Sequence, residues 1–144
     1  MAELQEDCLF CKIIRKEIPS YTVFENDDIK VFLDISQVTR GHVLLVPKKH
    51  LVNFFDYSQE DAAKFLQYIP KIANAVKNSN PDIKGVNVIA NNGEAAGQVV
   101  MHSHIHFIPR YENDNVDLPH ANNASQYNDK DYLAVANSIK KHLN

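Results

Sequence analysis

The stretch HSHIHFIPR, residues 102–110, places three histidines, His102, His104 and His106, at every second position. On a β-strand, side chains at alternate positions face the same side of the sheet, and neighbours in such a row lie roughly 6.6 Å apart. Two adjacent histidines could bind one metal ion, whereas all three could reach one ion only if the strand bends. Three interpretations stay open: a metal site, a catalytic row, or the solvated face of an edge strand. Because all three histidines of a straight strand do not reach one ion, the row is better suited to two neighbouring functions than to one.

The histidine row can also supply a nucleophile. Neutral imidazole attacks carbon or phosphorus, and its free pKa of about 6.5 makes the neutral form available at physiological pH. A second histidine or a backbone carbonyl can fix the tautomer by binding the other ring nitrogen. The turn Gly97-Gln98-Val99 comes shortly before the row and can bring backbone N–H groups close to an anion. These residues predict a nucleophile beside a site for an oxyanion or a phosphate.

Strands are predicted on the N-terminal side of the row. Residues 21–25 (YTVFE) and 29–34 (IKVFLD) flank a polar turn at 26–28, which indicates a β-hairpin. Residues 42–47 (HVLLVP) form an apolar run that is typical of a buried strand. Residues 85–93 (GVNVIANNG) indicate a further strand that ends in a polar turn.

Helical patterns separate these strands. Residues 8–17 predict a short helix or turn before the proline at 19. Apolar residues recur at helical spacing over 62–76, and Ser58 with Asp61 can cap the start of that helix. Pro70 lies inside the pattern, so a kink or two abutting helices are expected there.

The C-terminal part of the chain predicts a loop followed by a helix. Residues 111–128 are rich in Asn and Asp and indicate a long loop, and a last helix is expected from about Asp129. One face of that helix is apolar and consists of Tyr132, Val135, Ala136, Ile139 and Leu143. Hairpin-like strands with one long helix between them predict an α+β domain with a mostly antiparallel sheet.

Composition limits the classes of protein that fit. The chain has 144 residues, 44% of them hydrophobic and 23% charged, which is ordinary for a globular domain. A net charge of −3 argues against broad binding to nucleic acid, and no apolar run approaches the ~20 residues that span a bilayer. The first residues, MAELQEDC, lack the basic and apolar regions of a signal peptide. A cytoplasmic protein that binds neither nucleic acid nor membrane is expected.

The chain has two cysteines, Cys8 and Cys11, in the sequence CLFC. In a reducing compartment this spacing indicates half of a metal site or a redox pair, more than a structural disulfide. A metal site would have to be completed by histidine or carboxylate, because the chain offers no further thiol. A redox role is the weaker interpretation, since no thioredoxin-like βαβ pattern surrounds the two cysteines.

Two separated motifs resemble those of the histidine-triad (HIT) superfamily. The sequence AGQVVMHSHIHFIPR, residues 96–110, is similar to its signature, and CLFCKIIRKEIPSYTVFENDDIKVFLDISQVTRGHVLLVPKKH, residues 8–50, is similar to the N-terminal half of its Hint branch and bacterial relatives. The resemblance implies an α+β HIT fold, with an antiparallel sheet of about five strands, one long central helix and a C-terminal helix. It implies one HIT domain over 1–144, with a core at about 8–110, and a homodimer whose two sheets join.

The resemblance also implies an activity and its residues. Family members bind nucleotides and transfer or hydrolyse nucleotidyl groups at the α-phosphate, so a purine nucleotide or nucleotide conjugate is the expected ligand. His104 would be the nucleophile that forms a nucleotidyl-histidine, with His106 and His42 in the supporting phosphate and hydrogen-bond network. Asp34 would hold the ribose hydroxyls. The other nucleotide-binding positions are Phe10, Ile13, Leu33, Ile35 and Leu44 around the base, and Asn91, Gly97, Gln98 and Val99 near the phosphate.

A structural zinc ion is the implied cofactor. Structural zinc prefers four tetrahedral ligands from Cys and His. Some bacterial HIT proteins pair a Cys-x-x-Cys with two histidines, one of them the first of the triad. The resemblance gives Cys8, Cys11, His50 and His102 as the zinc ligands. Clustered carboxylates that would suit a phosphate-bound Mg²⁺ are not evident.

Val99 departs from the pattern, because Hint relatives often carry Ser or Thr there. The missing hydroxyl predicts slower turnover or an altered preference for the leaving group. Three functions stay open: a nucleoside phosphoramidase of the Hint type, a dinucleoside polyphosphate hydrolase, and a nucleotide-binding regulatory protein with weak catalysis. The N-terminal motif favours the first, because the dinucleoside polyphosphate branch generally lacks the Cys-x-x-Cys and the histidine of PKKH.

Overall fold

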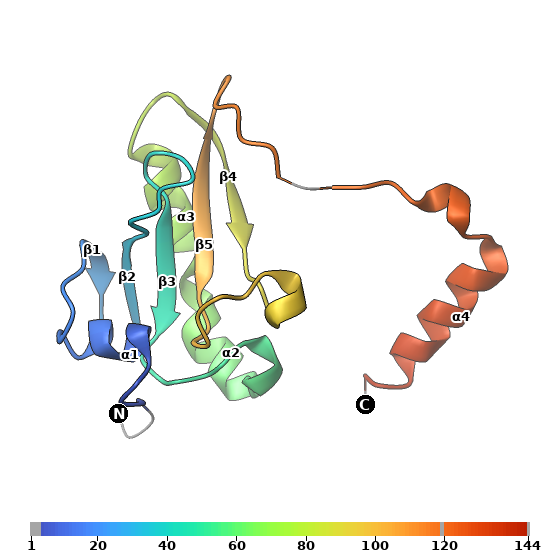
Figure 1. The fold of residues 1–144 in the computed structure, drawn as a ribbon, viewed down its shortest axis with the longest axis horizontal. Coiled ribbons are helices and arrows are strands. Elements are labelled where there is room, and N and C mark those ends of the chain that lie inside the picture. The colour runs from blue at the N-terminus through green and yellow to red at the C-terminus, as the bar shows by residue number, and fades with distance from the viewer. Residues whose placement is uncertain (1–3, 119, 144) are drawn as a thin grey trace.

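A computed structural model describes residues 4–118 and 120–143 of the protein. Over these residues the chain forms one antiparallel sheet, in the strand order β1-β2-β3-β5-β4 (Figure 1). The five strands are β1 (Thr22–Glu25), β2 (Ile29–Leu33), β3 (Val43–Pro47), β4 (Ile83–Ile89) and β5 (Ile105–Tyr111). The predicted α+β class, hairpin and antiparallel sheet are confirmed.

Helices lie before, between and after the strands. The α-helices are α1 (Leu9–Ile14), α2 (Gln59–Phe65), α3 (Ile69–Asn78) and α4 (Asp129–Lys140). Short 3-10 turns are η1 (Phe54–Asp56), η2 (Leu66–Tyr68), η3 (Glu94–Ala96) and η4 (Ala124–Gln126). None of the helices within the described residues is long and apolar enough to cross a bilayer.

The long central helix is divided into α2 and α3 by the turn η2. Ser58 and Asp61 form the predicted capping box at the start of α2. Pro70 lies in the first turn of α3, where a residue without an N–H removes no helical hydrogen bond. The prediction of two abutting helices at this proline is therefore confirmed.

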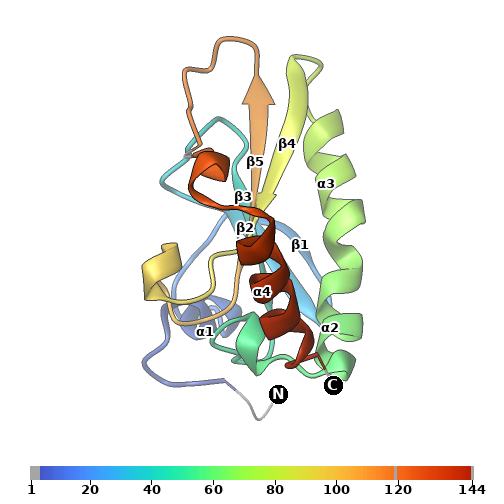
Figure 2. The ribbon, with the colours of Figure 1, turned by 90° about the vertical axis from the view of Figure 1, so that its right-hand side faces the viewer.

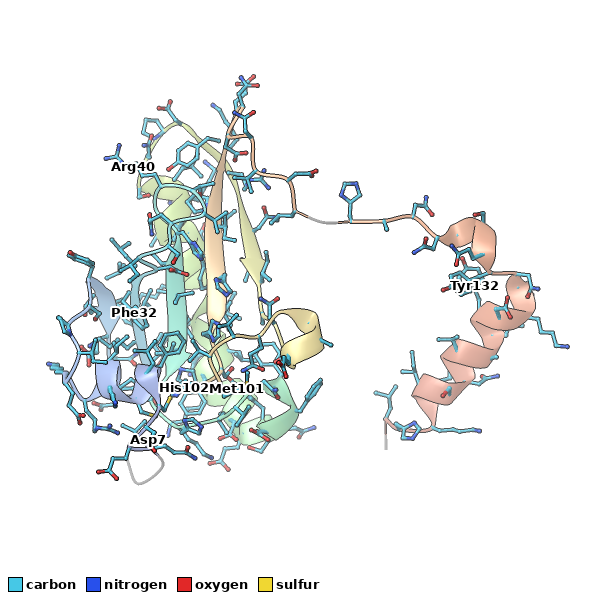
Figure 3. The ribbon with its side chains drawn as sticks, viewed as in Figure 1. Asp7, Phe32, Arg40, Met101, His102 and Tyr132 are labelled. Carbon is cyan, nitrogen blue, oxygen red and sulfur yellow. The ribbon has the colours of Figure 1, made fainter. Side chains whose placement is uncertain are left out.

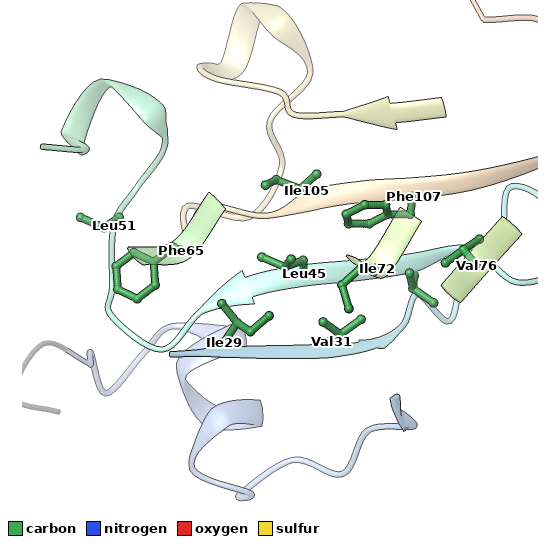
Figure 4. Packing of buried hydrophobic residues seen from close by; sticks show 10 residues of the cluster. Ile29, Val31, Leu45, Leu51, Phe65, Ile72, Val76, Ile105 and Phe107 are labelled. Atoms are coloured by element: carbon green, nitrogen blue, oxygen red, sulfur yellow. The ribbon is translucent and has the colours of Figure 1, made fainter. Parts of the chain in front are cut away.

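The central strand β3 is buried on both faces. One face carries Val43 and Leu45 and packs against α2 and α3, which contribute Phe65, Ile72 and Val76 (Figure 4). The residues between them in sequence point the other way, as the two-residue period of a strand requires. This second face, with Leu44 and Val46, packs against α1. Burial on both sides explains why residues 42–47 are almost continuously apolar.

The histidine row differs from the prediction of one regular strand. β5 begins only at Ile105, so His102 and His104 lie in the bend before it and His106 lies in the strand. The bend arises because the Ser103 N–H donates to the Leu51 carbonyl at 2.6 Å, outside the β-ladder. The Ser103 hydroxyl is also bonded to the Tyr57 hydroxyl at 2.8 Å. The three imidazoles therefore point to different places.

An extended arm follows the sheet. Residues 112–118 and 120–123 are free of helix and strand, and α4 starts at the predicted Asp129. Figure 1 shows α4 apart from the sheet on the side of β4, and Figure 2, viewed from that side, shows α4 in front of the rest of the chain.

Candidate active site and metal centre

Two thiols and two imidazoles form a compact cluster at one end of the sheet. Cys8 and Cys11 belong to the N-cap and first turn of α1, His50 follows β3, and His102 precedes β5. The Nδ1 atom of His102 lies 3.4 Å from Cys8 Sγ and 3.5 Å from Cys11 Sγ. The Nδ1 atom of His50 lies 3.3 Å from Cys11 Sγ. All four donor atoms lie within 4.8 Å of one another.

This geometry fits a tetrahedral zinc site. Bonds of about 2.3 Å to sulfur and about 2.0 Å to nitrogen place tetrahedral ligands roughly 3.3–3.8 Å apart. The other ring nitrogen of His102, Nε2, donates to the Pro47 carbonyl at 3.0 Å, which turns the Nδ1 lone pair towards the thiols. Burial lowers the pKa of His102 to about 4, so this imidazole is neutral, as a ligand must be. Burial raises the pKa of Cys11 to about 11, and a bound cation would stabilise its thiolate.

The hydrogen-bond partners of the other three histidines indicate which ring nitrogen of each carries the proton. The backbone N–H of Val38 donates to His42 Nδ1 at 3.1 Å, so neutral His42 carries its proton on Nε2. That atom lies 2.9 Å from His106 Nδ1 and donates to it. His106 therefore carries its own proton on Nε2. The Nδ1–H of His104 donates to the His102 carbonyl at 2.7 Å, which leaves the lone pair of His104 on Nε2.

These three histidines are kept neutral. Burial lowers the pKa of His42 and of His104, and it lowers that of His106 to about 4. The neighbouring histidines add to the effect at His106, because a second positive charge there is unfavourable. At neutral pH the Nε2 atom of His104 is consequently available as a nucleophile.

A cavity of about 690 Å³ lies beside His104 and His106 and is lined by both of them. It gathers residues from α1, from β2 and the residues after it, from β3 and from the loop before β5. The predicted nucleotide-binding residues that line it are Phe10, Ile13, Leu33, Asp34, Ile35, Leu44, Asn91, Gly97 and Val99. The rings of Phe10 and His104 form a T-shaped pair, with the ring centroids 5.1 Å apart. His42 lies behind His106 and contacts the site through it.

Asp34 lies at the edge of the cavity, immediately after β2. Its Oδ1 accepts the Ser36 N–H at 2.8 Å, and its Oδ2 lies 3.5 Å from His42 Nε2. The carboxylate is thus oriented by the chain and has further lone pairs on the cavity side. Such a group can accept two hydroxyl hydrogen bonds.

Gln98 differs from the other predicted nucleotide-binding residues, because it is not among the described residues that line the cavity. The buried amide donates to the carbonyls of Val52 and Val100 at 2.6 and 3.0 Å. Its oxygen accepts from Asn53 Nδ2 and the Gly93 N–H at 3.1 and 2.9 Å. All four bonds of the amide are used to hold the loop in place, and a direct contact of Gln98 with a nucleotide stays a prediction.

The sequence analysis missed several cavity residues, among them Phe32 and Val100; the others are Leu9, Ile18, Pro19, Ser20, Tyr21 and Ser36. Phe32 is paired with Leu44 across β2 and β3, so the strand register would have revealed it once Leu44 was assigned. Its neighbour Leu33, which was predicted, also lines the cavity because the chain turns after β2. Val100 lies in the irregular bend and carries no sequence signal of its own.

Sequence comparison assigns the class of protein. A HIT domain family model matches residues 15–113. The "Protein hit" of Bacillus subtilis is 43% identical over 139 residues, which is 96% of this chain and 95% of the relative. The chain belongs to the HIT family.

Several relatives carry names of activities, among them these two. Adenylylsulfatase HINT3 of Arabidopsis thaliana is 43% identical over 77% of this chain and 56% of its own length. Adenosine 5'-monophosphoramidase HNT1 of Candida albicans is 39% identical over 72% of this chain and 70% of its own length.

Solved structures confirm the fold. A HIT family member from Bacillus subtilis superimposes with a TM-score of 0.91 at 41% identity, over 96% of this chain and 99% of that chain. SMU.412c from Streptococcus mutans gives 0.90 at 41% identity, over 100% and 90%. A Zn-bound histidine triad family protein from Mycobacterium smegmatis gives 0.72 at 32% identity, over 83% and 86%.

Proposed function

We propose that this protein is a HIT-family hydrolase that acts at the α-phosphate of nucleotides, and specifically a purine nucleoside phosphoramidase. The observation that carries the proposal is the Nε2 lone pair of neutral His104 beside the cavity, fixed by the Nδ1–H bond to the His102 carbonyl. The names of the Candida albicans and Arabidopsis thaliana relatives support this type of chemistry.

The proposed reaction has two steps. In the first, His104 Nε2 attacks the α-phosphorus, a P–N bond to the histidine forms, and the bond from phosphorus to the leaving amine breaks. The amine takes a proton from water as it departs, and the neutral His106 keeps its Nε2–H and donates a hydrogen bond to the phosphate. In the second step, water attacks the nucleotidyl-histidine, the P–N bond breaks, and the nucleoside monophosphate is released. His42 holds His106 in the tautomer that directs an N–H towards the phosphate.

The rest of the cavity suits the nucleoside. The apolar side chains of Phe10, Ile13 and Leu44 offer walls for a flat base, and Asp34 offers acceptors for the ribose hydroxyls. The turn at 97–99 and Asn91 lie on the phosphate side in this proposal. The cavity, at about 690 Å³, has room for a two-ring base, and the name adenosine 5'-monophosphoramidase of the Candida albicans relative supports a purine.

The wider assembly is part of the proposal. Cys8, Cys11, His50 and His102 would hold a structural zinc ion that ties α1 and β3 to the start of β5. We propose one HIT domain over 1–144, and a homodimer whose sheets join at β4, which is an edge strand of the described sheet. A cytoplasmic location stays a prediction.

A substrate panel tests the activity. Adenosine and guanosine 5′-phosphoramidates are to be compared with diadenosine tri- and tetraphosphates on the full-length protein. We expect kcat/KM to be at least about 100-fold higher for the phosphoramidates. A preference for the dinucleotides would indicate a dinucleoside polyphosphate hydrolase. Tight binding without turnover of any of the four would indicate a regulatory nucleotide-binding protein.

Asp34→Asn is expected to weaken the recognition of ribose. The amide retains one acceptor but replaces the other by a donor, and it loses the charge that strengthens hydrogen bonds to hydroxyls. The kcat/KM for a ribonucleotide phosphoramidate should fall about 10- to 100-fold, and that for the 2′-deoxy analogue should change much less. Asp27→Asn, in the exposed turn of the hairpin, is the matched control. An equal loss of kcat/KM for the ribonucleotide and the 2′-deoxy substrate would contradict the role of Asp34 in ribose recognition.

Val99→Ser is expected to change the preference for the leaving group. Val99 lines the cavity but is 87% exposed, so it lies at the mouth. A serine hydroxyl there could bind a phosphate or a polar amine, and one such bond corresponds to about a 5- to 10-fold increase in kcat/KM. The increase in kcat/KM should be smaller for substrates whose leaving group is an aryl amine. Val99→Ala separates the new hydroxyl from the lost methyl groups, and equal kinetics for Val99 and the serine variant on all amines would refute the idea.

A further inference from the structure

A hydroxyl group is buried on the core side of the histidine row. Ser103, Ile105 and Phe107 alternate with the histidines in the sequence. Ile105 and Phe107 belong to the apolar cluster that packs against α2 and α3, and Ser103 is only 3% exposed. An apolar side chain would need no partner at this position, whereas a buried hydroxyl costs free energy unless it is hydrogen-bonded. The serine therefore requires an explanation beyond packing.

The partner of the Ser103 hydroxyl is the hydroxyl of Tyr57. The two oxygens lie 2.8 Å apart, which is a usual distance for a hydrogen bond between hydroxyls. The Tyr57 ring packs against the same apolar cluster and forms a T-shaped pair with Phe54, with ring centroids 5.1 Å apart. Burial raises the pKa of Tyr57, so the bond joins two neutral groups. Each hydroxyl compensates the other for the loss of water.

Tyr57 is itself held in place at the start of α2. It directly precedes Ser58, whose capping box with Asp61 fixes the first turn of that helix. The Asp61 carboxylate also accepts a hydrogen bond from Lys49 Nζ at 3.1 Å, and Lys49 lies just after β3. The start of α2 is thereby tied to the end of a central strand. The Tyr57 hydroxyl is consequently a fixed point that can set the bend before β5.

The peptide group between His102 and Ser103 is hydrogen-bonded at both ends. Its N–H belongs to Ser103 and donates to the Leu51 carbonyl at 2.6 Å. Its carbonyl belongs to His102 and accepts the Nδ1–H of His104 at 2.7 Å. The two bonds polarise the peptide and strengthen each other. The orientation of this one peptide therefore determines which nitrogen of His104 carries the proton and where its Nε2 points.

We propose that Ser103 and Tyr57 are positioning residues for the reaction, and that the bond between their hydroxyls keeps His104 Nε2 directed at the cavity. This inference rests on the proposed function, because it concerns the nucleophile of that reaction. Neither side chain is among the described residues that line the cavity, so the pair acts through the 102–103 peptide. His102, labelled in Figure 3, lies beside α1 and anchors the other side of that peptide through its bond to the Pro47 carbonyl. Without the Tyr57 bond, residue 103 is free to rotate and to tilt the peptide.

Removing either hydroxyl tests the proposal by kinetics. Ser103→Ala and Tyr57→Phe are each expected to lower kcat for a nucleoside phosphoramidate about 5- to 20-fold, because each leaves a buried hydroxyl unpaired and loosens the bend. KM and the Kd for the nucleoside monophosphate should stay within about 2-fold. The double variant should lose no more than about a further 2-fold in kcat, since both changes remove the same bond.

Tyr68→Phe is the matched control. Tyr68 also packs against the apolar cluster, and its hydroxyl donates to Asp28 at 2.6 Å, at the hairpin turn between β1 and β2. The substitution removes a hydroxyl with a comparable bond, so it reproduces the structural loss without touching the bend. Its kcat should equal that of the wild type.

The ring nitrogens of His104 test the same bond without any substrate. Full-length protein labelled with ¹⁵N in histidine is compared, as purified, between the wild type and the two single variants. The wild type should show His104 as the Nδ1–H tautomer, and the variants should show a mixture of both tautomers. Tyr57→Phe decides the question if Ser103→Ala does not fold, because it removes the same bond and leaves the histidine row unchanged.

Several results would overturn the inference. These are a wild-type kcat in both variants, a fall in kcat with an equal rise in Kd, effects that multiply in the double variant, and a loss of bound metal together with kcat. An unchanged tautomer of His104 would also overturn it and would leave the proposed function intact. A wild type that turns over no substrate would overturn the proposed function, and the tautomers of His104 would then decide the inference alone.

Discussion

Replacing His104 by alanine is expected to lower kcat by about 10⁴-fold or more on any substrate that the wild type cleaves. The reason is specific to this imidazole. Its Nδ1 is held by the His102 carbonyl at 2.7 Å, so its Nε2 lone pair is the nucleophile. His106 and His42 cannot replace it, because the Nδ1 atom of each already accepts a hydrogen bond.

Nucleotide binding should survive the His104→Ala change to within about 10-fold. The walls of the cavity come from α1, β2 and β3, and Asp34 is independent of His104. Binding is measured by calorimetry with the nucleoside monophosphate, and turnover by release of the amine. Single-turnover reactions with labelled substrate should leave label on wild-type protein after a rapid base quench and none on the variant.

His120→Ala is the matched control, because His120 is exposed in the arm, and its kcat should equal that of the wild type. Free imidazole offers a further test, since it can enter the space left by the side chain and restore part of the turnover of His104→Ala. A variant that keeps more than about a tenth of wild-type kcat would refute a covalent role. Loss of binding together with turnover would point to a structural role instead.

Breaking the thiol–imidazole cluster is expected to remove zinc and destabilise the fold. Protein purified without added metal should contain about one zinc per chain, and His50→Gln or Cys11→Ser should reduce this below about 0.2. The four ligands join α1, the end of β3 and the bend before β5, segments that are far apart in sequence. Loss of such a site should cost several kcal/mol, which corresponds to a Tm lower by about 10–15 °C.

The controls separate the metal from ordinary packing. Cys11 is fully buried, so Cys11→Ser alone could destabilise the protein by leaving a polar group in the core. His50 is less buried, and His120→Gln is the same substitution at an exposed position, where metal content and Tm should not change. A strong chelator should lower the Tm of the wild type and leave that of His50→Gln unchanged. Wild-type protein without zinc and with the same Tm as His50→Gln would exclude the structural metal site.

Much of the architecture could be predicted from local sequence. The hairpin around 26–28 follows from two apolar runs separated by turn residues, and the buried strand β3 follows from its continuous apolar run. Ser58 and Asp61 marked the start of α2, and Pro70 marked the division of the helix. These features depend on residues within a few positions of one another, so the sequence contains all the information that they need.

The candidate site was predictable only in part. The predicted nucleotide-binding positions followed from the resemblance, and the structure places nearly all of them at the cavity wall. Gln98 shows the limit. The motif predicted a phosphate contact, but the four hydrogen bonds of its amide go to Val52, Asn53, Gly93 and Val100. Two of these partners, Val52 and Asn53, lie more than forty positions from Gln98, and such partners cannot be read from the spacing of the motif.

The histidine row distinguishes what the sequence determines from what the tertiary structure decides. The sequence by itself determined the family, the sheet, and the presence of two cysteines and several histidines that could serve a metal and a nucleophile. The tertiary structure decided which histidine lies at the thiol cluster and which lies at the cavity. The Ser103 N–H bonds to Leu51 instead of a neighbouring strand, and the chain bends there, so His102 faces the thiols and His104 faces the cavity. Backbone direction at a bend depends on a distant hydrogen-bond partner, which no local pattern specifies.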